Sequence, residues 1–315
     1  MTMTSLPDSA SAKFCDTLDI DQENHLLYAG DNWSGGVDVF DISTPKADYV
    51  RTIRILGVIF GVVVAKNVEK LFVGLSGSQL AVVDTNATSD RANTEIARLY
   101  TGGMSHTDLL DYDPVNKKVY AASRNDGFMI TVDASTNEIV GRVEGLGPGL
   151  EQPRYNSRDG MVYLTSDRGN ALLQIDPAEN RLVKRFEIPD ACYPKGLAIN
   201  AALNRALIAC GNKERSHTVI WDLNEHKILS IIEEAGSGDG AIYDATIDRF
   251  FFAAHDYRGG PVIGIYGGDP VRFLAKVHTN RAAGWVAYDR THRVVYAPAI
   301  QNGKPALLSF VLPDV

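Results

Sequence analysis

A short unit recurs seven times along this chain of 315 residues. Each copy has a turn residue, then a strand-like run built around one large side chain, and then small residues. Clear copies are DPVNKKVYAAS at 113–123, NSRDGMVYLTS at 156–166 and DRTHRVVYAPA at 289–299. A fixed period of this kind indicates a repeat architecture, so it limits the possible folds more than any other feature does.

The spacing within and between the copies is regular. The large side chains that anchor them are Tyr28, Phe72, Tyr120, Tyr163, Leu207, Phe251 and Tyr296. Subtracting successive numbers gives spacings of 44, 48, 43, 44, 44 and 45 residues. Seven positions before each anchor stands its turn residue: Asp21, Ala65, Asp113, Asn156, Asn200, Asp244 and Asp289. A constant offset in every copy indicates that the copies are structural equivalents.

Each unit reads as four strands. In the third unit, LLDY at 109–112 precedes the turn, the anchor strand follows, MITVD ends at Asp133, and EIVGRVE supplies the fourth. Enrichment in Val, Ile, Tyr and Phe between Asn, Asp and Gly is typical of strands. Four strands per roughly 45 residues form a propeller blade. We therefore predict an all-β, seven-bladed β-propeller with four-stranded antiparallel blades, forming one domain over residues 1–315.

The seventh unit ends at its third strand, in ALLSFVLPDV. Its fourth strand must come from elsewhere in the chain, and residues 2–6 are available. A strand from the N-terminus would close the ring and remove exposed sheet edges. We expect residues 2–6 to pair with the strand at 306–312.

The repeats resemble those of the YVTN-repeat propellers, which are WD40-like and pair a "kvYva" strand with a "vsviD" strand. VYLTSDRGNALLQID at 162–176 matches this pattern best, and EQPRYNSRDGMVYLT at 151–165 resembles the blade openings of that group. The resemblance covers nearly the whole chain. It implies the architecture and not the activity, because such propellers host several unrelated functions.

One position of the repeat collects charge. Five residues before each turn residue stand Asp16, Phe60, Asp108, Glu151, Lys195, Asp239 and Gly284. The first strand of a propeller blade lines the central channel, so these side chains should meet at one mouth of it. Two positions further in stand the apolar or small residues Leu18, Val62, Leu110, Pro153, Leu197, Ala241 and Val286. The pattern predicts a charged mouth above an apolar channel.

Side chains from this position and from nearby loops make up the candidate site. The candidate catalytic residues are His106, Asp108, Glu151, Lys195, Asp239 and His255. The candidate substrate-binding residues are Arg124, Gln152, Arg154, Tyr257, Trp33 and Trp285. Aromatic rings beside convergent polar groups suit a small-molecule pocket. In the alternative interpretation, the charges are solvated or form salt bridges between blades, and the histidines are surface loop residues.

Four carboxylates around one axis repel one another, which raises pKa values or favours a bound cation. Asp16, Asp108, Glu151 and Asp239 approach from different blades, as the oxygen ligands of Ca²⁺ or Mg²⁺ would. The placement is similar to that in metal-dependent propeller lactonases and lyases, although no family motif matches residue by residue. Lys195 competes with this cation hypothesis because it can neutralise neighbouring carboxylates.

Net charge, apolar runs and cysteine usage argue against several classes of function and location. The net charge of −8 disfavours nucleic-acid binding, and no apolar run approaches the roughly 18 residues of a membrane span. The first residues lack the basic and apolar regions of a signal peptide. Cys15, Cys192 and Cys210 form a sparse, odd set, so we expect reduced thiols and a cytoplasmic location.

Two functions remain open. The first is an enzyme acting on a small organic substrate at the channel mouth, either a lactonase-like hydrolase or a lyase. His106 or His255 would transfer protons, and Lys195 or Arg154 would stabilise negative charge. Lys195 could also form a Schiff base if the pocket lowered its pKa. The second function is a non-catalytic scaffold that binds a protein or a small ligand on one face.

Overall fold

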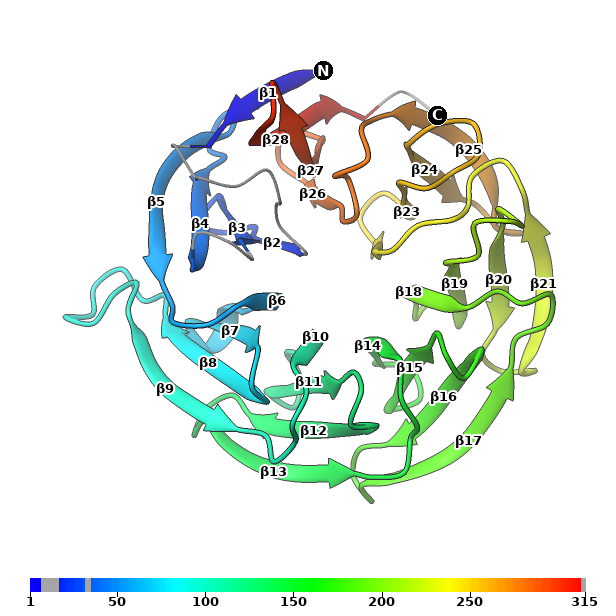
Figure 1. The fold of residues 1–315 in the computed structure, drawn as a ribbon, viewed down its shortest axis with the longest axis horizontal. Coiled ribbons are helices and arrows are strands. Elements are labelled where there is room, and N and C mark those ends of the chain that lie inside the picture. Colours follow the sequence, from blue (N-terminus) through cyan, green and yellow to red (C-terminus); the bar gives the residue numbers. More distant parts are fainter. Residues whose placement is uncertain (7–16, 32–34, 313–315) are drawn as a thin grey trace.

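A computed structural model of the chain describes residues 1–6, 17–31 and 35–312. Seven four-stranded antiparallel sheets stand in a ring, each with one strand nearest the centre (Figure 1). The innermost strands are β2 (Leu18–Asp21), β6 (Ile59–Ala65), β10 (Thr107–Asp113), β14 (Leu150–Asn156), β18 (Pro194–Asn200), β22 (Ala241–Asp244) and β26 (Ala287–Asp289). The second strands are β3 (Leu26–Asp31), β7 (Lys70–Leu75), β11 (Lys118–Ser123), β15 (Met161–Ser166), β19 (Arg205–Cys210), β23 (Arg249–Ala254) and β27 (Val294–Gln301).

The outer half of each blade follows the same order. The third strands are β4 (Gly36–Asp41), β8 (Gln79–Asp84), β12 (Phe128–Asp133), β16 (Ala171–Asp176), β20 (Thr218–Asp222), β24 (Val262–Gly267) and β28 (Lys304–Val311). The outermost strands are β5 (Asp48–Arg54), β9 (Glu95–Tyr100), β13 (Glu138–Val143), β17 (Arg181–Glu187), β21 (Lys227–Ile232), β25 (Arg272–His278) and β1 (Thr2–Ser5). The seven-bladed, all-β prediction is confirmed. The described part of the chain has one short helix, the 3-10 turn η1 (Lys66–Val68), and no helix long and apolar enough to cross a membrane.

In all seven blades the innermost strand ends at the turn residue found in the sequence. Most of these residues accept hydrogen bonds from the turn that follows. In blade three, for example, Asp113 Oδ1 lies 2.9 Å from the Val115 nitrogen and 3.1 Å from the Asn116 nitrogen. Asp and Asn side chains stabilise turns in this way. Ala65 has no such acceptor, and in that blade the chain forms η1 instead.

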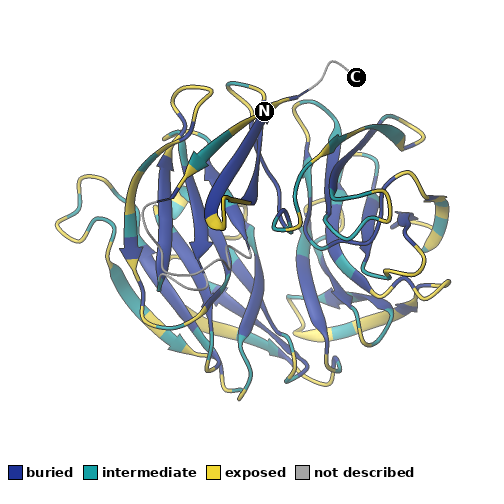
Figure 2. Cartoon of the chain, turned by 45° about the horizontal axis from the view of Figure 1, so that its top comes forward, coloured by how far each residue is buried: buried dark blue, intermediate teal, exposed yellow. Residues whose placement is uncertain are grey.

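The hydrophobic core lies between neighbouring blades. Tyr120 of blade three shares a cluster with Leu164 of blade four, and Tyr163 of blade four shares the next cluster with Trp221 of blade five. The three inner strands of each blade are largely buried, whereas the outermost strands and the turns carry the exposed positions (Figure 2). The anchor residues of the repeat are therefore the side chains that join one blade to the next.

The ring closes through β1, as the sequence predicts. The seventh sheet has the order β1-β28-β27-β26, with Thr2 opposite Ser309 and Ser5 opposite Ala306. Figure 1 shows β1 lying along β28, beside the first blade. Leu6 continues from β1 into the cluster that contains Leu18 and Leu307. Blade seven is thus assembled from the two ends of the chain.

The innermost strands of blades two to five each contain a β-bulge. The pairing register shifts between Ile59 and Gly61, Thr107 and Leu110, Leu150 and Pro153, and Pro194 and Leu197. Each bulge falls on the charged position of the repeat or directly beside it. A bulge inserts an extra residue and re-aims the local side chains. In these blades the simple alternation of faces along the strand is interrupted near the channel mouth.

The expectation of reduced thiols is wrong for two of the three cysteines. Cys192 and Cys210 form a disulfide across 18 residues of sequence. They meet because β18 and β19 are antiparallel, with Pro194 opposite Cys210, so that the residues just before β18 lie beside the end of β19. Cys15 lies outside the described residues.

The closing segment should be important for stability. Leu6 is 7% exposed and joins the closing strand to the core, so Leu6→Ala should lower the free energy of unfolding by about 2–4 kcal/mol, measured by urea denaturation. Val311→Ala on the neighbouring strand is the matched control. Its side chain is 65% exposed, so the change should stay within about 0.5 kcal/mol. Equal stability of Leu6→Ala and wild type would contradict closure through this segment.

Candidate functional site

The charged position of the repeat does converge at one mouth of the channel. A cavity of about 260 Å³ is lined there by Phe60, His106, Asp108, Leu109, Arg124, Glu151, Lys195, Asp239 and Trp285. Seven of the residues predicted from the sequence are among these. Asp16 and Trp33, which were also predicted, lie outside the described residues.

Arg124 stands at the centre of the mouth. Its guanidinium pairs with Glu151, lies 3.4 Å from Asp108 Oδ2, and donates to Asp167 Oδ2 at 2.6 Å. Burial acts to lower the pKa of Arg124, but the three carboxylates outweigh it, and the pKa lies above its usual value. Arg124 is therefore a permanent cation that links blades three and four.

His106 is positioned by its two neighbours. Its ring stacks on Phe60 with a centroid distance of 4.0 Å, and its Nε2 lies 3.6 Å from Asp108 Oδ2. The stacking fixes the plane of the ring, and Asp108 is the carboxylate next to its Nε2. This arrangement is a His–Asp pair open to the cavity, because both residues line it.

Lys195 and Asp239 form the second ion pair, with 3.3 Å between Nζ and Oδ2. Asp239 raises the pKa of Lys195 above its usual value, and this outweighs the opposing effect of burial. A Schiff-base nucleophile needs the opposite shift, because only the neutral amine attacks. The Schiff-base interpretation of Lys195 is therefore wrong, and the side chain acts as a positive charge.

Glu151 is the most buried carboxyl group of the mouth, with 3% of its surface exposed. Burial raises its pKa well above the ordinary value of 4.5, and the charge of Asp239 adds to this, while Arg124 opposes it. Neighbouring Asp108 raises the pKa further. The mouth thus combines a carboxyl group whose pKa is raised with two fixed cations.

The carboxylates of the mouth do not form a close ligand group. Across residues 1–6, 17–31 and 35–312, the structure brings three potential metal-ligand atoms within 4.8 Å of one another only at Cys192, Cys210 and His217. Asp108, Glu151 and Asp239 instead each face a cationic side chain. A cation at this mouth stays a prediction that depends on Asp16.

Gln152 and Arg154 are not at the mouth. Gln152 is fully buried, and its amide joins two blades by accepting from the Leu197 nitrogen at 2.7 Å and donating to the Ala241 oxygen at 3.1 Å. Arg154 lines a different cavity, near the other ends of the innermost strands. Gln152 is therefore a structural residue, and the prediction of both side chains as substrate contacts at the mouth is wrong.

His255 and Tyr257 lie in the loop after β23, beside the mouth but outside the cavity lining. His255 Nε2 is 3.5 Å from Asp256 Oδ2, and the Tyr257 ring lies under the Lys276 ammonium at 4.6 Å. Tyr257 also packs against the core cluster that contains Ala254 and Val262.

The opposite end of the channel holds a larger cavity, of about 780 Å³, which the sequence analysis missed. Asp19, Asp111 and Arg154 line it, and Arg154 Nη1 donates to Asp111 Oδ1 at 3.1 Å. Burial raises the pKa of Asp19 to about 6. All three stand two positions before a turn residue, so the repeat itself places charged residues at this position in three blades. Trp285 lines both cavities.

The prediction of an apolar channel below the mouth is confirmed only in part. Leu18, Val62, Leu110 and Val286 do line the larger cavity, but the charged residues Asp19, Asp111 and Arg154 line it as well. Leu197 and Ala241, two of the apolar residues expected in it, are fully buried in clusters between blades. The bulges explain the difference. In blades three and four they shift the alternation of faces, so that the charged position and the position three residues further on both face the channel.

Comparisons with known proteins define the fold and nothing finer. No family model matches this chain, and no curated protein sequence matches it. A chain in the solved "Crystal Structure of Mitotic Checkpoint Complex" is similar with a TM-score of 0.79 at 13% identity, covering 99% of this chain and 91% of that one. "Structure of U3-55K" is similar with a TM-score of 0.80 at 9% identity, covering 98% of each. The chain is a seven-bladed β-propeller.

The raised pKa of Glu151 predicts a pH dependence of stability. A carboxyl group whose pKa is higher in the folded state binds a proton on folding, so stability falls as pH rises from about 4.5 towards the folded pKa. Glu151→Gln removes this loss, which amounts to at most about 1.4 kcal/mol for each pH unit. Urea denaturation across that range should show that the free energy of unfolding of the variant increases relative to that of wild type as pH rises.

Glu144→Gln is the matched control, because the Glu144 side chain is 64% exposed. Its stability should follow that of wild type at every pH. Parallel profiles for Glu151→Gln and wild type would contradict the raised pKa.

Proposed function

We propose that this propeller is an enzyme that acts on a small organic molecule at the channel mouth, as a lactonase-like hydrolase or a lyase. The proposal depends chiefly on one observation, namely that a nearly fully buried carboxyl group, Glu151, borders a polar cavity of about 260 Å³. Carboxyl groups with perturbed protonation in a cavity are frequent in catalytic sites. We also propose that the chain belongs to the YVTN-repeat group of propellers.

The side chains of the mouth divide into complementary roles. The raised pKa of Glu151 suits it to donate a proton to a leaving group. His106, oriented by Asp108 and Phe60, would accept a proton from water or from a carbon next to a carbonyl group. These two roles are what hydrolysis of a cyclic ester or an elimination requires.

The two cations would stabilise the negative charge that develops on the substrate. Lys195 lies in an ion pair with Asp239 and is electrostatically coupled to Glu151. Arg124 contacts the carboxylates of both Glu151 and Asp108. Fixed cations in a site of limited water access stabilise charge more than they would in bulk water. A substrate with a carbonyl or carboxylate group fits them.

The remaining features of the proposal come from the sequence. A Ca²⁺ or Mg²⁺ ion that uses Asp16 together with Asp108, Glu151 or Asp239 would take over part of the charge stabilisation. The partner is a small molecule and not a nucleic acid, in keeping with the net charge of −8. We place the protein in the cytoplasm.

The test is turnover of two substrate panels. γ- and δ-lactones are followed by proton release, and hydroxy acids that eliminate water are followed by the absorbance of the unsaturated product. Glu151→Gln should lower kcat by roughly 10²- to 10⁴-fold, the usual contribution of general acid–base catalysis. The same variant should be at least as stable as wild type at neutral pH, so the loss of activity cannot come from unfolding.

Glu144→Gln serves as the control and should keep the wild-type kcat. Two results would contradict the proposal: no turnover of either panel by wild type, or full activity of Glu151→Gln. The non-catalytic scaffold would then be the better interpretation.

A further inference from the structure

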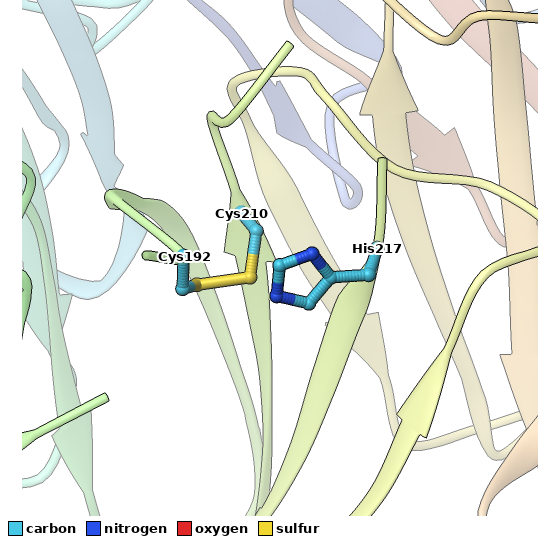
Figure 3. Close-up of side chains that lie close together, drawn as sticks. All are labelled: Cys192, Cys210 and His217. Carbon is cyan, nitrogen blue, oxygen red and sulfur yellow. A yellow bond between two sulfur atoms is a disulfide. The ribbon is translucent and has the colours of Figure 1, made fainter. Parts of the chain in front are cut away.

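Two cysteines and a histidine form a buried cluster in blade five, and none of the three lines the mouth cavity. Cys192 precedes β18, Cys210 ends β19, and His217 precedes β20. Each of the three residues is 0% exposed, and their potential ligand atoms all lie within 4.8 Å of one another. Figure 3 shows the imidazole ring beside the disulfide, with one ring edge facing the sulfur atoms.

The tautomer of His217 follows from its surroundings. Nδ1 lies 2.8 Å from the Arg215 carbonyl oxygen, which can only accept a hydrogen bond, so Nδ1 carries the proton. Nε2 therefore presents a lone pair. This atom is buried and has no hydrogen-bond partner. A buried polar atom without a partner is costly, and natural proteins contain few of them.

The disulfide does not relieve this cost, because it has no proton to donate to Nε2. The reduced pair does, since two thiols or a metal ion between two thiolates would engage the lone pair. A histidine whose other nitrogen donates to a backbone carbonyl is also the usual arrangement of a metal ligand, because that bond fixes the tautomer and the ring plane. The cluster is thus better matched to the reduced state than to the oxidised one.

We propose that the reduced form of this protein binds Zn²⁺ through the sulfur atoms of Cys192 and Cys210 and Nε2 of His217. Two thiolates and one imidazole, with water as a fourth ligand, form a known type of zinc coordination. A small dithiol is the reductant. It transfers two electrons and two protons to the disulfide, giving two thiols and its own disulfide. Zinc binding then releases both thiol protons, because the ligands are thiolates.

The loop that carries Cys192 provides the required movement. The sulfur atoms must separate to accommodate a metal with Zn–S distances of about 2.3 Å. Asp190, Ala191 and Tyr193 all have positive φ angles, of 63°, 50° and 49°. Residues with a Cβ adopt this region at a cost, so we expect the segment to shift once the bond is broken.

The experiment uses the full chain with Cys15→Ser, so that only the pair contributes thiols. The protein is reduced with excess dithiothreitol, separated from it without oxygen, and titrated with Co²⁺ as a spectroscopic probe and with Zn²⁺ by competition. We expect one metal ion per chain. We also expect a thiolate-to-cobalt charge-transfer band and the visible bands of tetrahedral Co²⁺, all of which should be absent before reduction.

Two variants test the ligands. Cys192→Ser/Cys210→Ser should abolish the bands. His217→Gln should weaken Zn²⁺ binding by at least the roughly 10- to 100-fold that loss of a supporting partner alone costs. His278→Gln, at an exposed position of β25, is the matched control and should bind like the parent. Circular dichroism checks that each variant is folded, and His217→Asn provides a second substitution if His217→Gln is not.

Three results would overturn the proposal. The first is a pair that stays oxidised in excess dithiol, because the metal-binding state would then not be reached in the native protein. The second is reduced protein that binds Zn²⁺ no more tightly than the double serine variant. The third is unchanged affinity in both His217 variants, which would show thiolate binding without the histidine.

Discussion

Each blade has two hydrophobic faces, and the structure depends on covering both of them with neighbouring blades. A four-stranded sheet cannot bury its own faces, and a row of such sheets would leave the two end faces in water. A ring leaves none, provided that the last sheet is complete and meets the first. The tyrosines and phenylalanines of the second strands, which are among the largest fully buried side chains, contribute to this contact. The channel, and the convergence of polar side chains at its mouth, follow from the same closure.

The mouth contains more acidic than basic side chains. Two effects reduce the repulsion between the acidic groups, namely ion pairing and a raised pKa. Arg124 contacts three carboxylates, and Lys195 pairs with a fourth. Glu151, which is also within reach of the charge of Asp239, is shifted towards its neutral form. A stability-optimised protein would place an amide or an apolar residue there. Keeping a desolvated carboxyl group at this position is a cost that chemistry at the site would explain.

The fold was predictable from the sequence because its determinants are local and repeated. Asp113 and its equivalents end the innermost strands through contacts with residues two or three positions away, and these contacts need no knowledge of the ring. The pairing of β1 with β28 was predictable for a different reason, since only one unit lacked a fourth strand. The charged mouth was predictable because one position of the repeat carried it.

The second cavity, the disulfide and the role of Gln152 depended on geometry that the repeat does not encode. The bulge near Glu151 allows Arg154, three residues later, to face the channel as well, whereas strict alternation assigns these side chains to opposite faces. Asp111, which follows the bulge of blade three, was missed for the same reason. The contact between Cys192 and Cys210 requires the register of one particular hairpin. The role of Gln152 as a link between blades requires the positions of blades five and six, which carry its two partners.

Closure by β1 also determines the order in which the molecule can be completed during synthesis. The ribosome delivers β1 first and β28 last, so the N-terminal strand has no partner until nearly the whole chain has emerged. Every blade between them can form earlier from contiguous sequence. A nascent chain therefore carries an open sheet edge and an uncovered first blade for most of its translation, and such edges recruit other strands. Translation speed and chaperone protection of the first blade should therefore influence how much of this protein reaches the closed ring.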